Sequence, residues 1–316
     1  MRILISGGFG FIGGKLAQHL AGHGHKIILG SRFKKNSPSW LPSAEVCSFN
    51  WSSSKAIDLI CEDVDVVIHA AGMNAQDCYE NSRQALSFNG FATERFAYSA
   101  SKMGVKKFIY ISTAHVYSDP LEGLITERSI PKNHHPYATS HLAGENAVIE
   151  ISNKSIMQGI IIRLSNTFGA PVSINSTCWT LLINDLCLQA VRDKKLLLKS
   201  SGKQHRNFIG ISNVSNAITH LLQKNFQSSK FEIYNLGSEV SNSVGDVAKL
   251  IQDRCNSILG FRPPVIKPTN KEDSKNFKSI TYSIDKLKKK GVEFNTKDKI
   301  DEIDNLLKFC SKNFEA

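Results

Sequence analysis

The 316-residue sequence contains no run of about 18 or more apolar residues, which is the length that a membrane-spanning helix requires. The chain passes from Met1 and Arg2 directly into the strand-like stretch Ile-Leu-Ile-Ser, so nothing in it resembles a secretory signal. We therefore expect no membrane insertion and a cytoplasmic location.

The sequence also lacks the cysteine spacings of metal sites. Its seven cysteines show no Cys-x-x-Cys pair, and an odd number argues against a disulfide framework. We expect reduced thiols and no metal site. The cysteines are Cys47, Cys61, Cys78, Cys178, Cys187, Cys255 and Cys310.

A nucleic-acid-binding signature is absent as well, although the formal net charge is +11. Many lysines lie in residues 267–312, where they alternate with Asp and Glu, and this pattern is typical of a solvated face. We expect no nucleic-acid partner.

Continuous apolar runs alternate with amphipathic stretches over the first half of the chain. Strand follows helix in a regular rhythm, which predicts an α/β fold with a Rossmann-type, doubly wound parallel sheet. Ligands of such sheets bind at the carboxyl ends of the strands. The expected strands are residues 2–6, 25–30, 63–71, 106–112 and 157–165.

After residue 165 this rhythm changes, which predicts a smaller C-terminal α/β lobe for the substrate. We expect a helix at 243–255 capped by Ser243. The predicted dinucleotide-binding domain is 1–165, with returning segments near 207–236; the predicted substrate lobe is 166–206 and 237–316.

Gly7, Gly10 and Gly13 lie between the first strand and the first helix. Glycines allow a tight turn close to a pyrophosphate, and the helix N-terminus offers free N–H groups to it. The strand, turn and helix around them predict dinucleotide binding.

The end of the second strand lacks the acidic residue that usually accepts hydrogen bonds from the adenosine ribose of NAD. Ser31 and Arg32 stand there, followed by Lys34 and Lys35. A guanidinium binds a 2′-phosphate well, so we expect NADP(H) to be preferred, with NAD(H) as the alternative.

Tyr137 and His141 are four positions apart at the start of a predicted helix, so they share one face. With this pair and the glycine turn, the chain resembles the extended short-chain dehydrogenase/reductase superfamily. Three further stretches carry the resemblance: Val-Val-Ile-His-Ala-Ala-Gly at 66–72, Ile-Ser-Thr-Ala-His-Val-Tyr at 111–117 and Arg-Leu-Ser-Asn-Thr-Phe-Gly-Ala-Pro at 163–171. The nucleotide-sugar epimerases, dehydratases and reductases of this superfamily are the most similar in pattern.

The resemblance implies site residues. Tyr137 would exchange a proton with the sugar, and Thr113 would orient the reacting oxygen. Cofactor contacts are implied at Gly7, Gly10, Phe11, Ile12, Gly13, Ser31, Arg32, Ala70, Ala71, Gly72, Asn89 and His141.

His141 stands where the family normally has lysine. Lysine both hydrogen-bonds the nicotinamide ribose and places a positive charge near the tyrosine, whereas a neutral imidazole performs only the first role. His141 either substitutes, as a protonated ring or a ribose ligand, or the oxidised nicotinamide supplies the charge, or the protein is a catalytically weak binder.

Ala114 and His115 replace the Asp-Glu pair with which the family's 4,6-dehydratases eliminate water. Ordinary 4,6-dehydration is therefore not expected. His115 either moves a proton at the sugar ring or is a packed, neutral histidine.

For the substrate, the resemblance implies that Asn166 and Arg206 bind the nucleotide diphosphate, although Asn207 replaces the aspartate that usually follows the arginine. Asn74, Cys178 and Trp179 are further candidates, with core packing the alternative for Trp179. Candidates for a later phosphate-binding residue are Arg262, Lys271 and Lys275.

These features predict an NADP(H)-preferring oxidoreductase or epimerase that acts on a nucleotide-diphosphate sugar in polysaccharide-precursor synthesis, as a homodimer. One alternative is a catalytically weakened regulatory or scaffold protein that binds the cofactor. Another is a reductase of small carbonyl compounds.

Overall fold

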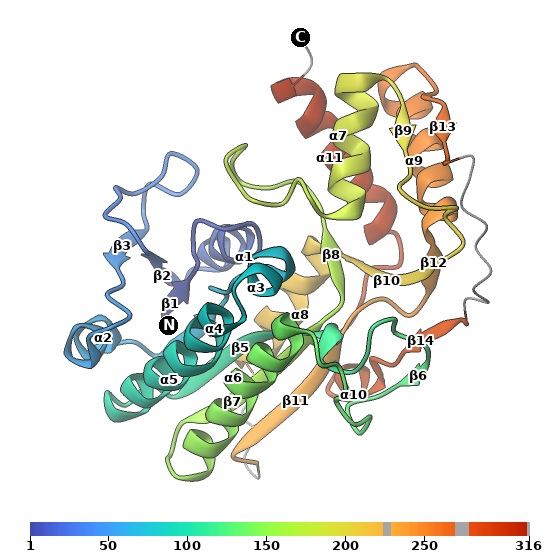
Figure 1. Cartoon of the computed structure of the whole chain (residues 1–316). Helices are drawn as coiled ribbons and strands as arrows, with labels where there is room; N and C mark the ends of the chain where they lie inside the picture. The colour runs from blue at the N-terminus through green and yellow to red at the C-terminus, as the bar shows by residue number, and fades with distance from the viewer. Residues whose placement is uncertain (224–228, 269–277, 315–316) are drawn as a thin grey trace. The chain divides into compact units, whose positions relative to one another are not determined.

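The computed structural model describes residues 1–223, 229–268 and 278–314 (Figure 1). The chain divides into two compact units, each formed by three segments. The first unit contains Met1–Asp119, Glu127–Leu164 and Leu221–Asn235; the second contains Pro120–Thr126, Ser165–His220 and Leu236–Ala316.

A seven-stranded sheet forms the centre of the first unit, in the order β11-β7-β5-β4-β1-β2-β3. The pairs from β3 across to β7 are parallel, which confirms the predicted Rossmann-type fold. The strands are β1 (Arg2–Ser6), β2 (Lys26–Ser31), β3 (Glu45–Ser48), β4 (Val66–His69), β5 (Lys107–Thr113), β7 (Gln158–Leu164) and β11 (Phe231–Leu236).

Helices α2, α5 and α6 share one apolar core with the sheet. Ile57, Phe96 and Val148 from these helices pack in the same cluster as Val67 and Phe108 from the strands. Figure 1 shows α5 and α6 side by side. The helical segments of this unit are α1 (Phe11–Gly22), α2 (Ser54–Cys61), α3 (Ala75–Glu80), α4 (Ser82–Ala85), the π-helix η1 (Leu86–Ala92), α5 (Thr93–Lys102), the 3-10 turn η2 (Ala114–Val116) and α6 (Pro136–Asn153).

The strand register places three polar side chains in one row across this buried sheet. Ser6 of β1 is the partner of His69 in β4, and His69 is the partner of Tyr110 in β5. Because side chains in one row of a sheet project to the same face, Ser6, His69 and Tyr110 lie beside one another.

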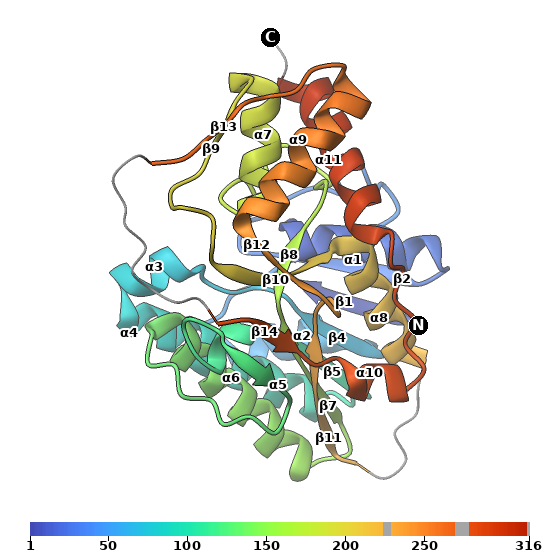
Figure 2. The ribbon, with the colours of Figure 1, turned by 90° about the vertical axis from the view of Figure 1, so that its right-hand side faces the viewer.

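The second unit is built around three helices, α7 (Leu182–Asp193), α9 (Val244–Leu259) and α11 (Asp298–Phe314), which enclose an apolar core (Figure 2). Ser243 accepts a hydrogen bond from the Asp246 nitrogen and confirms the predicted cap of α9. The other elements are β6 (Gly123–Ile125), β8 (Asn166–Phe168), β9 (Leu196–Leu197), β10 (His205–Gly210), α8 (Ile211–Gln223), β12 (Ser241–Ser243), β13 (Val265–Ile266), β14 (Ile280–Tyr282) and α10 (Asp285–Lys289).

Two buried carboxylates of α11 close the N-terminus of α8. Glu302 Oε1 accepts a hydrogen bond from the Ser212 nitrogen at 3.1 Å and another from the Ser212 hydroxyl. The buried Asp298 carboxyl lies against Gly210, where an added Cβ would collide with Asp298 Oδ2. The free N–H groups that begin a helix are thus satisfied from within the chain.

The boundary between the units differs from the predicted one over residues 207–220. These residues group with the second unit, because β10 pairs with β8 and β12 and not with the seven-stranded sheet. The chain returns to the first unit at Leu221.

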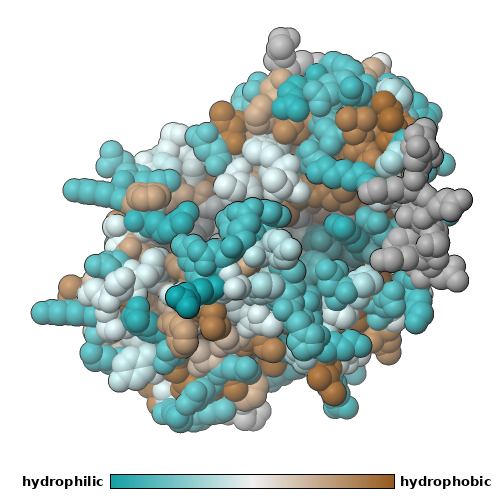
Figure 3. Space-filling model, viewed as in Figure 1, coloured by the Kyte–Doolittle hydropathy of each residue, from teal (hydrophilic) through white to brown (hydrophobic). Residues whose placement is uncertain are grey.

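Among the described residues, no helix combines the length and the apolar composition needed to cross a membrane. On the face that Figure 3 shows, hydrophobic residues are interspersed with hydrophilic ones.

Candidate active site

The turn between β1 and α1 has room for backbone atoms only. Gly7 has φ +67°, and a Cβ there would lie 2.9 Å from the Ala71 nitrogen. A Cβ at Gly13 would collide with the Gly7 carbonyl oxygen, and the Gly10 nitrogen donates to that oxygen at 2.9 Å. The sequence therefore needs glycine at these positions to bring strand and helix this close.

The N-terminus of α1 is open. Gly10 is its N-cap and provides no side chain, and the first turn, Phe-Ile-Gly-Gly, contains no acidic residue. The backbone N–H groups of Phe11 and Ile12, in the first turn, have no acceptor within the helix. This backbone cradle fits a dinucleotide pyrophosphate.

Gly72, which follows β4, faces two of the residues expected to contact the cofactor. A Cβ at Gly72 would lie 3.5 Å from Asn89 Oδ1 and 3.7 Å from His141 Nε2. Asn89 is buried, accepts a hydrogen bond from the Met73 nitrogen at 2.9 Å and donates to Ser140 Oγ at 3.1 Å. Asn89 thus fixes the chain after β4 against α6.

Ala70 and Ala71 lead from β4 to this position. The Ala70 nitrogen donates to the Ser6 carbonyl oxygen at 3.2 Å, and the Ala71 nitrogen donates to Ser6 Oγ at 3.3 Å. The end of β1 therefore holds the chain that follows β4.

The end of β2 presents the basic loop. Ser31 Oγ accepts a hydrogen bond from the Phe33 nitrogen, which positions the start of the loop. Arg32 is exposed, with its guanidinium 5.9 Å from the Phe33 ring, and Lys35 Nζ lies 4.4 Å from the ring of Phe9 in the glycine turn. Lys35 thus stands beside the glycine turn, and Arg32 lies next to an aromatic ring of its own loop.

Thr113 and Tyr137 come together at the end of β5. Thr113 Oγ1 accepts a hydrogen bond from the His115 nitrogen at 3.1 Å and starts η2. Tyr137 lies in the first turn of α6, whose N-cap His135 accepts a hydrogen bond from the Tyr137 nitrogen. Burial raises the pKa of Tyr137 above its ordinary value, and a hydrogen bond with Thr113 acts in the opposite direction. Tyr137 is therefore a phenol at neutral pH.

His141 lies one helical turn after Tyr137, and the two rings meet edge to face with centroids 4.6 Å apart. Burial lowers the pKa of His141 to about 4, so the imidazole is neutral near pH 7. Its Nδ1 is 2.9 Å from the Tyr110 hydroxyl. The ring therefore does not replace the charge of a lysine, but one of its nitrogens still carries a proton to donate.

A buried ion pair anchors the helix that carries Tyr137 and His141. Glu145 of α6 accepts bidentate hydrogen bonds from Arg163 of β7, with a shortest distance of 2.6 Å, and another from Ser112 of β5. Both partners are almost completely buried, and the sequence motifs did not indicate their pairing. The spacing of Glu145, four residues after His141, was the available signal.

His115 is half-buried, and its carbonyl oxygen accepts a hydrogen bond from Asn133 Nδ2 at 2.7 Å. This contact and its amide bond to Thr113 fix its backbone. Asn74 is the N-cap of α3: its side chain accepts from the Asp77 nitrogen and donates to Asp77 Oδ2. That local role accounts for Asn74 without a ligand.

The remaining substrate candidates belong to the second unit. Asn166 Nδ2 donates to the Asn207 carbonyl oxygen at 2.9 Å, while Arg206 is exposed on β10. Asn207 is buried and exchanges hydrogen bonds with the backbone of Ser238, so it serves as a structural link between β10 and the chain after β11.

Three further candidates are accounted for by structure. Cys178 is buried, and Trp179 packs against the helical core of the second unit and donates to the Ile174 carbonyl oxygen. Arg262 forms an exposed ion pair with Asp253. The candidates Lys271 and Lys275 lie outside the described residues.

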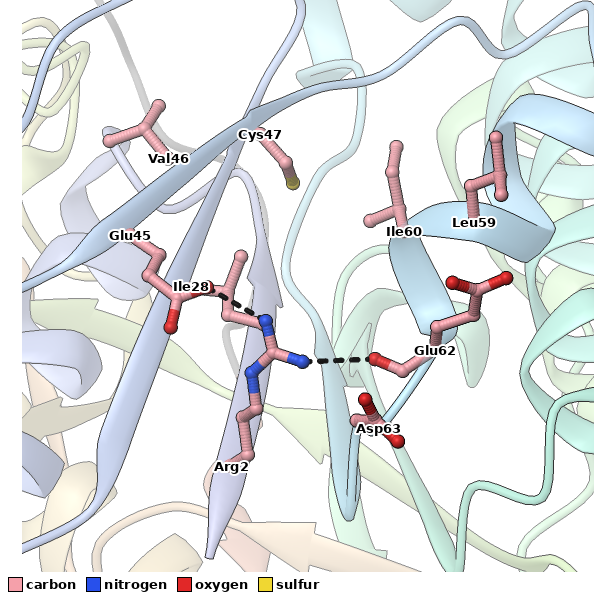
Figure 4. A pocket seen from close by; sticks show the side chains of 9 residues that line it. All are labelled: Arg2, Ile28, Glu45, Val46, Cys47, Leu59, Ile60, Glu62 and Asp63. Carbon is pink, nitrogen blue, oxygen red and sulfur yellow. Dashed lines mark hydrogen bonds and ion pairs between the residues drawn. The ribbon is translucent and has the colours of Figure 1, made fainter.

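A pocket of about 310 Å³ lies at the opposite end of the strands, where β1 and β3 begin (Figure 4). Arg2 dominates it, but its guanidinium already binds Glu45 Oε2 at 2.7 Å and the Glu62 carbonyl oxygen at 3.0 Å. Because neither Tyr137 nor His141 lines this pocket, we assign the active site by its chemistry and not by the size of a cavity.

Comparison with known proteins identifies relatives that act on nucleotide sugars. Two curated relatives are a dTDP-D-glucose 4,6-dehydratase of Dictyostelium discoideum, 27% identical over 79% of this chain, and UDP-glucuronic acid decarboxylase 1 of Danio rerio, 25% identical over 79% of it. The chain spans only 61% and 60% of the lengths of these two proteins.

Solved structures share the fold. MoeE5 in complex with UDP-glucuronic acid and NAD superposes with a TM-score of 0.82 at 18% identity, over 99% of this chain and 100% of that one. UDP-glucose 4-epimerase of Thermotoga maritima, with UDP-glucose, has a TM-score of 0.82 at 19% identity, and all of both chains is covered. The model of the NAD dependent epimerase/dehydratase family matches residues 3–237. The chain therefore belongs to the NAD dependent epimerase/dehydratase family.

Proposed function

We propose that this protein is an NADP(H)-preferring oxidoreductase or epimerase that acts on a nucleotide-diphosphate sugar, most simply as a keto-sugar reductase in polysaccharide-precursor synthesis. The observation that carries the proposal is the edge-to-face contact of the Tyr137 ring with His141, one helical turn later, together with the effect of Thr113 on the pKa of Tyr137. His141 in turn faces Gly72. A dinucleotide bound at this position would have a proton donor beside it.

The protonation states favour reduction. Both Tyr137 and His141 are neutral near pH 7, so the resting site holds a phenolic proton that it can give to a keto oxygen. The bound nicotinamide would supply the hydride, which would go to the carbonyl carbon of the sugar. Tyr137 would protonate the oxygen, and the resulting phenolate would regain its proton from solvent.

We do not propose dehydration as the reaction, although one of the curated relatives is a dTDP-D-glucose 4,6-dehydratase. Ala114 and His115 follow Thr113 where an acid and a base carboxyl would be required, and neither is a carboxylic acid. Epimerisation stays within the proposal because it needs only hydride transfer and proton transfer through Tyr137.

The test is to incubate purified protein with NADPH and nucleotide-diphosphate 4-keto-6-deoxy sugars and to follow the nicotinamide absorbance. We expect absorbance to fall with the wild type and not with Tyr137→Phe. No absorbance loss with any such sugar, together with no interconversion of nucleotide sugars by chromatography, would refute the proposal.

Cofactor preference has its own test. Arg32→Ala removes the guanidinium beside the predicted 2′-phosphate position, so we expect NADPH to bind about ten-fold more weakly and NADH to be unaffected. Lys34→Ala is the control, because it removes a neighbouring charge without the bidentate donor. Equal losses for both cofactors would argue against the preference for NADP(H).

A second candidate function follows from the same neutral imidazole: a cofactor-binding protein with little catalytic activity. His141→Lys separates the two. A large gain in turnover would indicate a weakened site, whereas a loss would show that the surroundings of His141 are adapted to histidine.

A further inference from the structure

A continuous line of hydrogen-bonding side chains crosses the buried sheet behind the active site. Ser6 Oγ lies 2.6 Å from His69 Nδ1, and His69 Nε2 lies 2.9 Å from Thr93 Oγ1. Burial raises the pKa of Tyr110 and the neighbouring Thr93 hydroxyl acts in the opposite direction; the Tyr110 hydroxyl is 2.9 Å from His141 Nδ1. All five side chains are at most 6% exposed. Each proton position in this line is therefore decided by its neighbours.

The end at Ser6 determines the direction of the line. Ser6 Oγ already accepts a hydrogen bond from the Ala71 nitrogen at 3.3 Å, and among the described residues the only other group it contacts is His69 Nδ1. If His69 Nδ1 carried the proton, the Ser6 hydroxyl would be a buried donor with no acceptor among the described residues, which is unfavourable. Ser6 therefore donates to His69.

The remaining protons follow in sequence. His69 Nε2–H donates to the Thr93 hydroxyl, which neighbours Tyr110. The Tyr110 hydroxyl then has two acceptors within reach, His141 Nδ1 at 2.9 Å and the Asn89 carbonyl oxygen at 3.5 Å. A phenol hydroxyl is a stronger proton donor than a neutral imidazole N–H, and an imidazole nitrogen is a stronger acceptor than a phenol oxygen, so the 2.9 Å contact is favoured as Tyr110 O–H to His141 Nδ1. Tyr110 therefore donates to His141 Nδ1, and the ring proton of His141 resides on Nε2.

We propose that Tyr110 is a positioning residue that fixes His141 as its Nε2–H tautomer, so that the single N–H of the ring is presented to a ribose hydroxyl of the bound dinucleotide. His141 Nε2 is the nitrogen that faces Gly72, at the end of the Ala-Ala-Gly stretch that follows β4. The contact with the dinucleotide rests on the proposed function; the tautomer does not.

This arrangement explains how histidine works in a lysine position. An ammonium group is a donor in every orientation, whereas a neutral imidazole donates only from the nitrogen that carries its proton. Without the Tyr110 hydroxyl, His141 would divide between two tautomers, and one of them would turn a lone pair toward the ribose hydroxyl.

The tautomer is measured directly on the full-length protein. Histidine labelled with ¹⁵N gives distinct shifts for protonated and unprotonated ring nitrogens, and comparison with His141→Gln assigns the His141 signals. We expect wild-type His141 to carry its proton on Nε2 at pH 7, with a coupling between the Tyr110 hydroxyl proton and Nδ1. A proton on Nδ1 would overturn the inference.

The role of Tyr110 is tested by Tyr110→Phe, which removes the hydroxyl and keeps the ring. We expect mixed tautomers of His141 and NADPH binding about five-fold weaker, as for the loss of one hydrogen bond. Tyr98→Phe is the matched control, because the Tyr98 ring is 60% exposed on α5. If Tyr110→Phe matched Tyr98→Phe in both measurements, Tyr110 would have no positioning role.

The outcomes separate this inference from the proposed function. A wild type that binds no dinucleotide would refute the function and the ribose contact together, whatever the tautomer. A wild type that binds NADPH with His141 protonated on Nδ1 would refute the inference alone. If Tyr110→Phe does not fold, the tautomer and the coupling in the wild type decide the question.

Discussion

The N-termini of α1 and α8 differ in what stands next to their free backbone N–H groups. Both helices begin with backbone N–H groups that have no partner within the helix. At α8 the chain brings two buried carboxylates, Asp298 and Glu302, from a helix that is almost ninety residues further along the sequence. At α1 there is neither a capping side chain nor an acidic residue in the first turn.

The difference separates structural sites from ligand sites. A helix end that the chain closes with its own carboxyl groups needs no ligand. The N-terminus of α1 is left open beside glycines at which a Cβ would collide with neighbouring backbone atoms. It therefore keeps a positive potential that can bind the anionic group of a ligand. Four substitutions test this comparison.

Gly13→Ala should have the largest effect. The added methyl group collides with the Gly7 carbonyl oxygen, so the turn must shift, and we expect dinucleotide binding to weaken at least hundred-fold, equivalent to about 2.7 kcal/mol. Titration of NADPH fluorescence measures this.

Gly22→Ala is the matched control for Gly13→Ala. It lies in the last turn of the same helix, and a Cβ there meets nothing within 4 Å. We expect unchanged binding and a stability gain of up to about 1 kcal/mol. If both variants lost dinucleotide binding equally, the loss would come from a change in the stability of α1 and not from the collision at Gly13.

Asp298→Asn tests the closed end. Burial, together with the charge of Glu302, raises the pKa of Asp298 to about 7. A carboxyl group whose folded-state pKa is raised binds more protons in the folded state. Its stabilising contribution is therefore complete below pH 4 and is lost as the pH rises toward 7.

In Asp298→Asn this dependence should disappear. Between pH 4 and pH 7 we expect the free energy of unfolding of the wild type to fall relative to that of the variant by about 2–4 kcal/mol. Urea unfolding at several pH values measures the difference, with the exposed Asp301→Asn of the same helix as control. Parallel pH profiles for wild type and Asp298→Asn would contradict the assignment.

Glu302→Ala leaves the Ser212 nitrogen and hydroxyl without their acceptor, so we expect a loss of about 2 kcal/mol in the free energy of unfolding. Hydrogen exchange should show the first turn of α8 opening before the rest of the second unit. Asp301→Ala removes an exposed carboxylate from the same helix and should change stability by less than about 0.5 kcal/mol.

Ser243→Ala should have the smallest effect. Ser243 caps α9 by accepting from the Asp246 nitrogen at 3.0 Å, and its hydroxyl donates to Asp246 Oδ2 at 2.7 Å; both contacts are exposed, so their loss costs about 1 kcal/mol. Ser257→Ala, near the other end of α9, is the control. A loss as large as that of Glu302→Ala would mean that the charge of the buried carboxylates adds nothing to a cap.

The sequence predicted those parts of the fold that depend on the local pattern of residues. Apolar runs predicted the parallel strands, and glycine spacing predicted the turn before α1. Thr113, Tyr137 and His141 were recognised because the family spaces them along the chain, and the structure brings these three side chains together.

What the sequence did not indicate depends on register and long-range packing. Ser6, His69 and Tyr110 look like ordinary strand residues until the pairing of β1, β4 and β5 puts them in one row. Asp298 and Glu302 read as part of a solvated, charged helix, because no local signal says that α11 packs against the start of α8. Asn74 was predicted to contact the substrate, and in the structure its side chain caps α3. The sequence does not distinguish these roles, because asparagine serves both as a ligand contact and as a helix cap.

The 2.9 Å contact between Tyr110 and His141 also constrains how this chain diverged. Lysine at position 141 would require acceptors from its surroundings, whereas histidine, in the tautomer proposed here, requires one donor from the core. We therefore predict epistasis between the two positions: histidine at 141 should be favourable only in a background that carries a hydroxyl at 110. Among relatives, the two residues should be inherited as a pair.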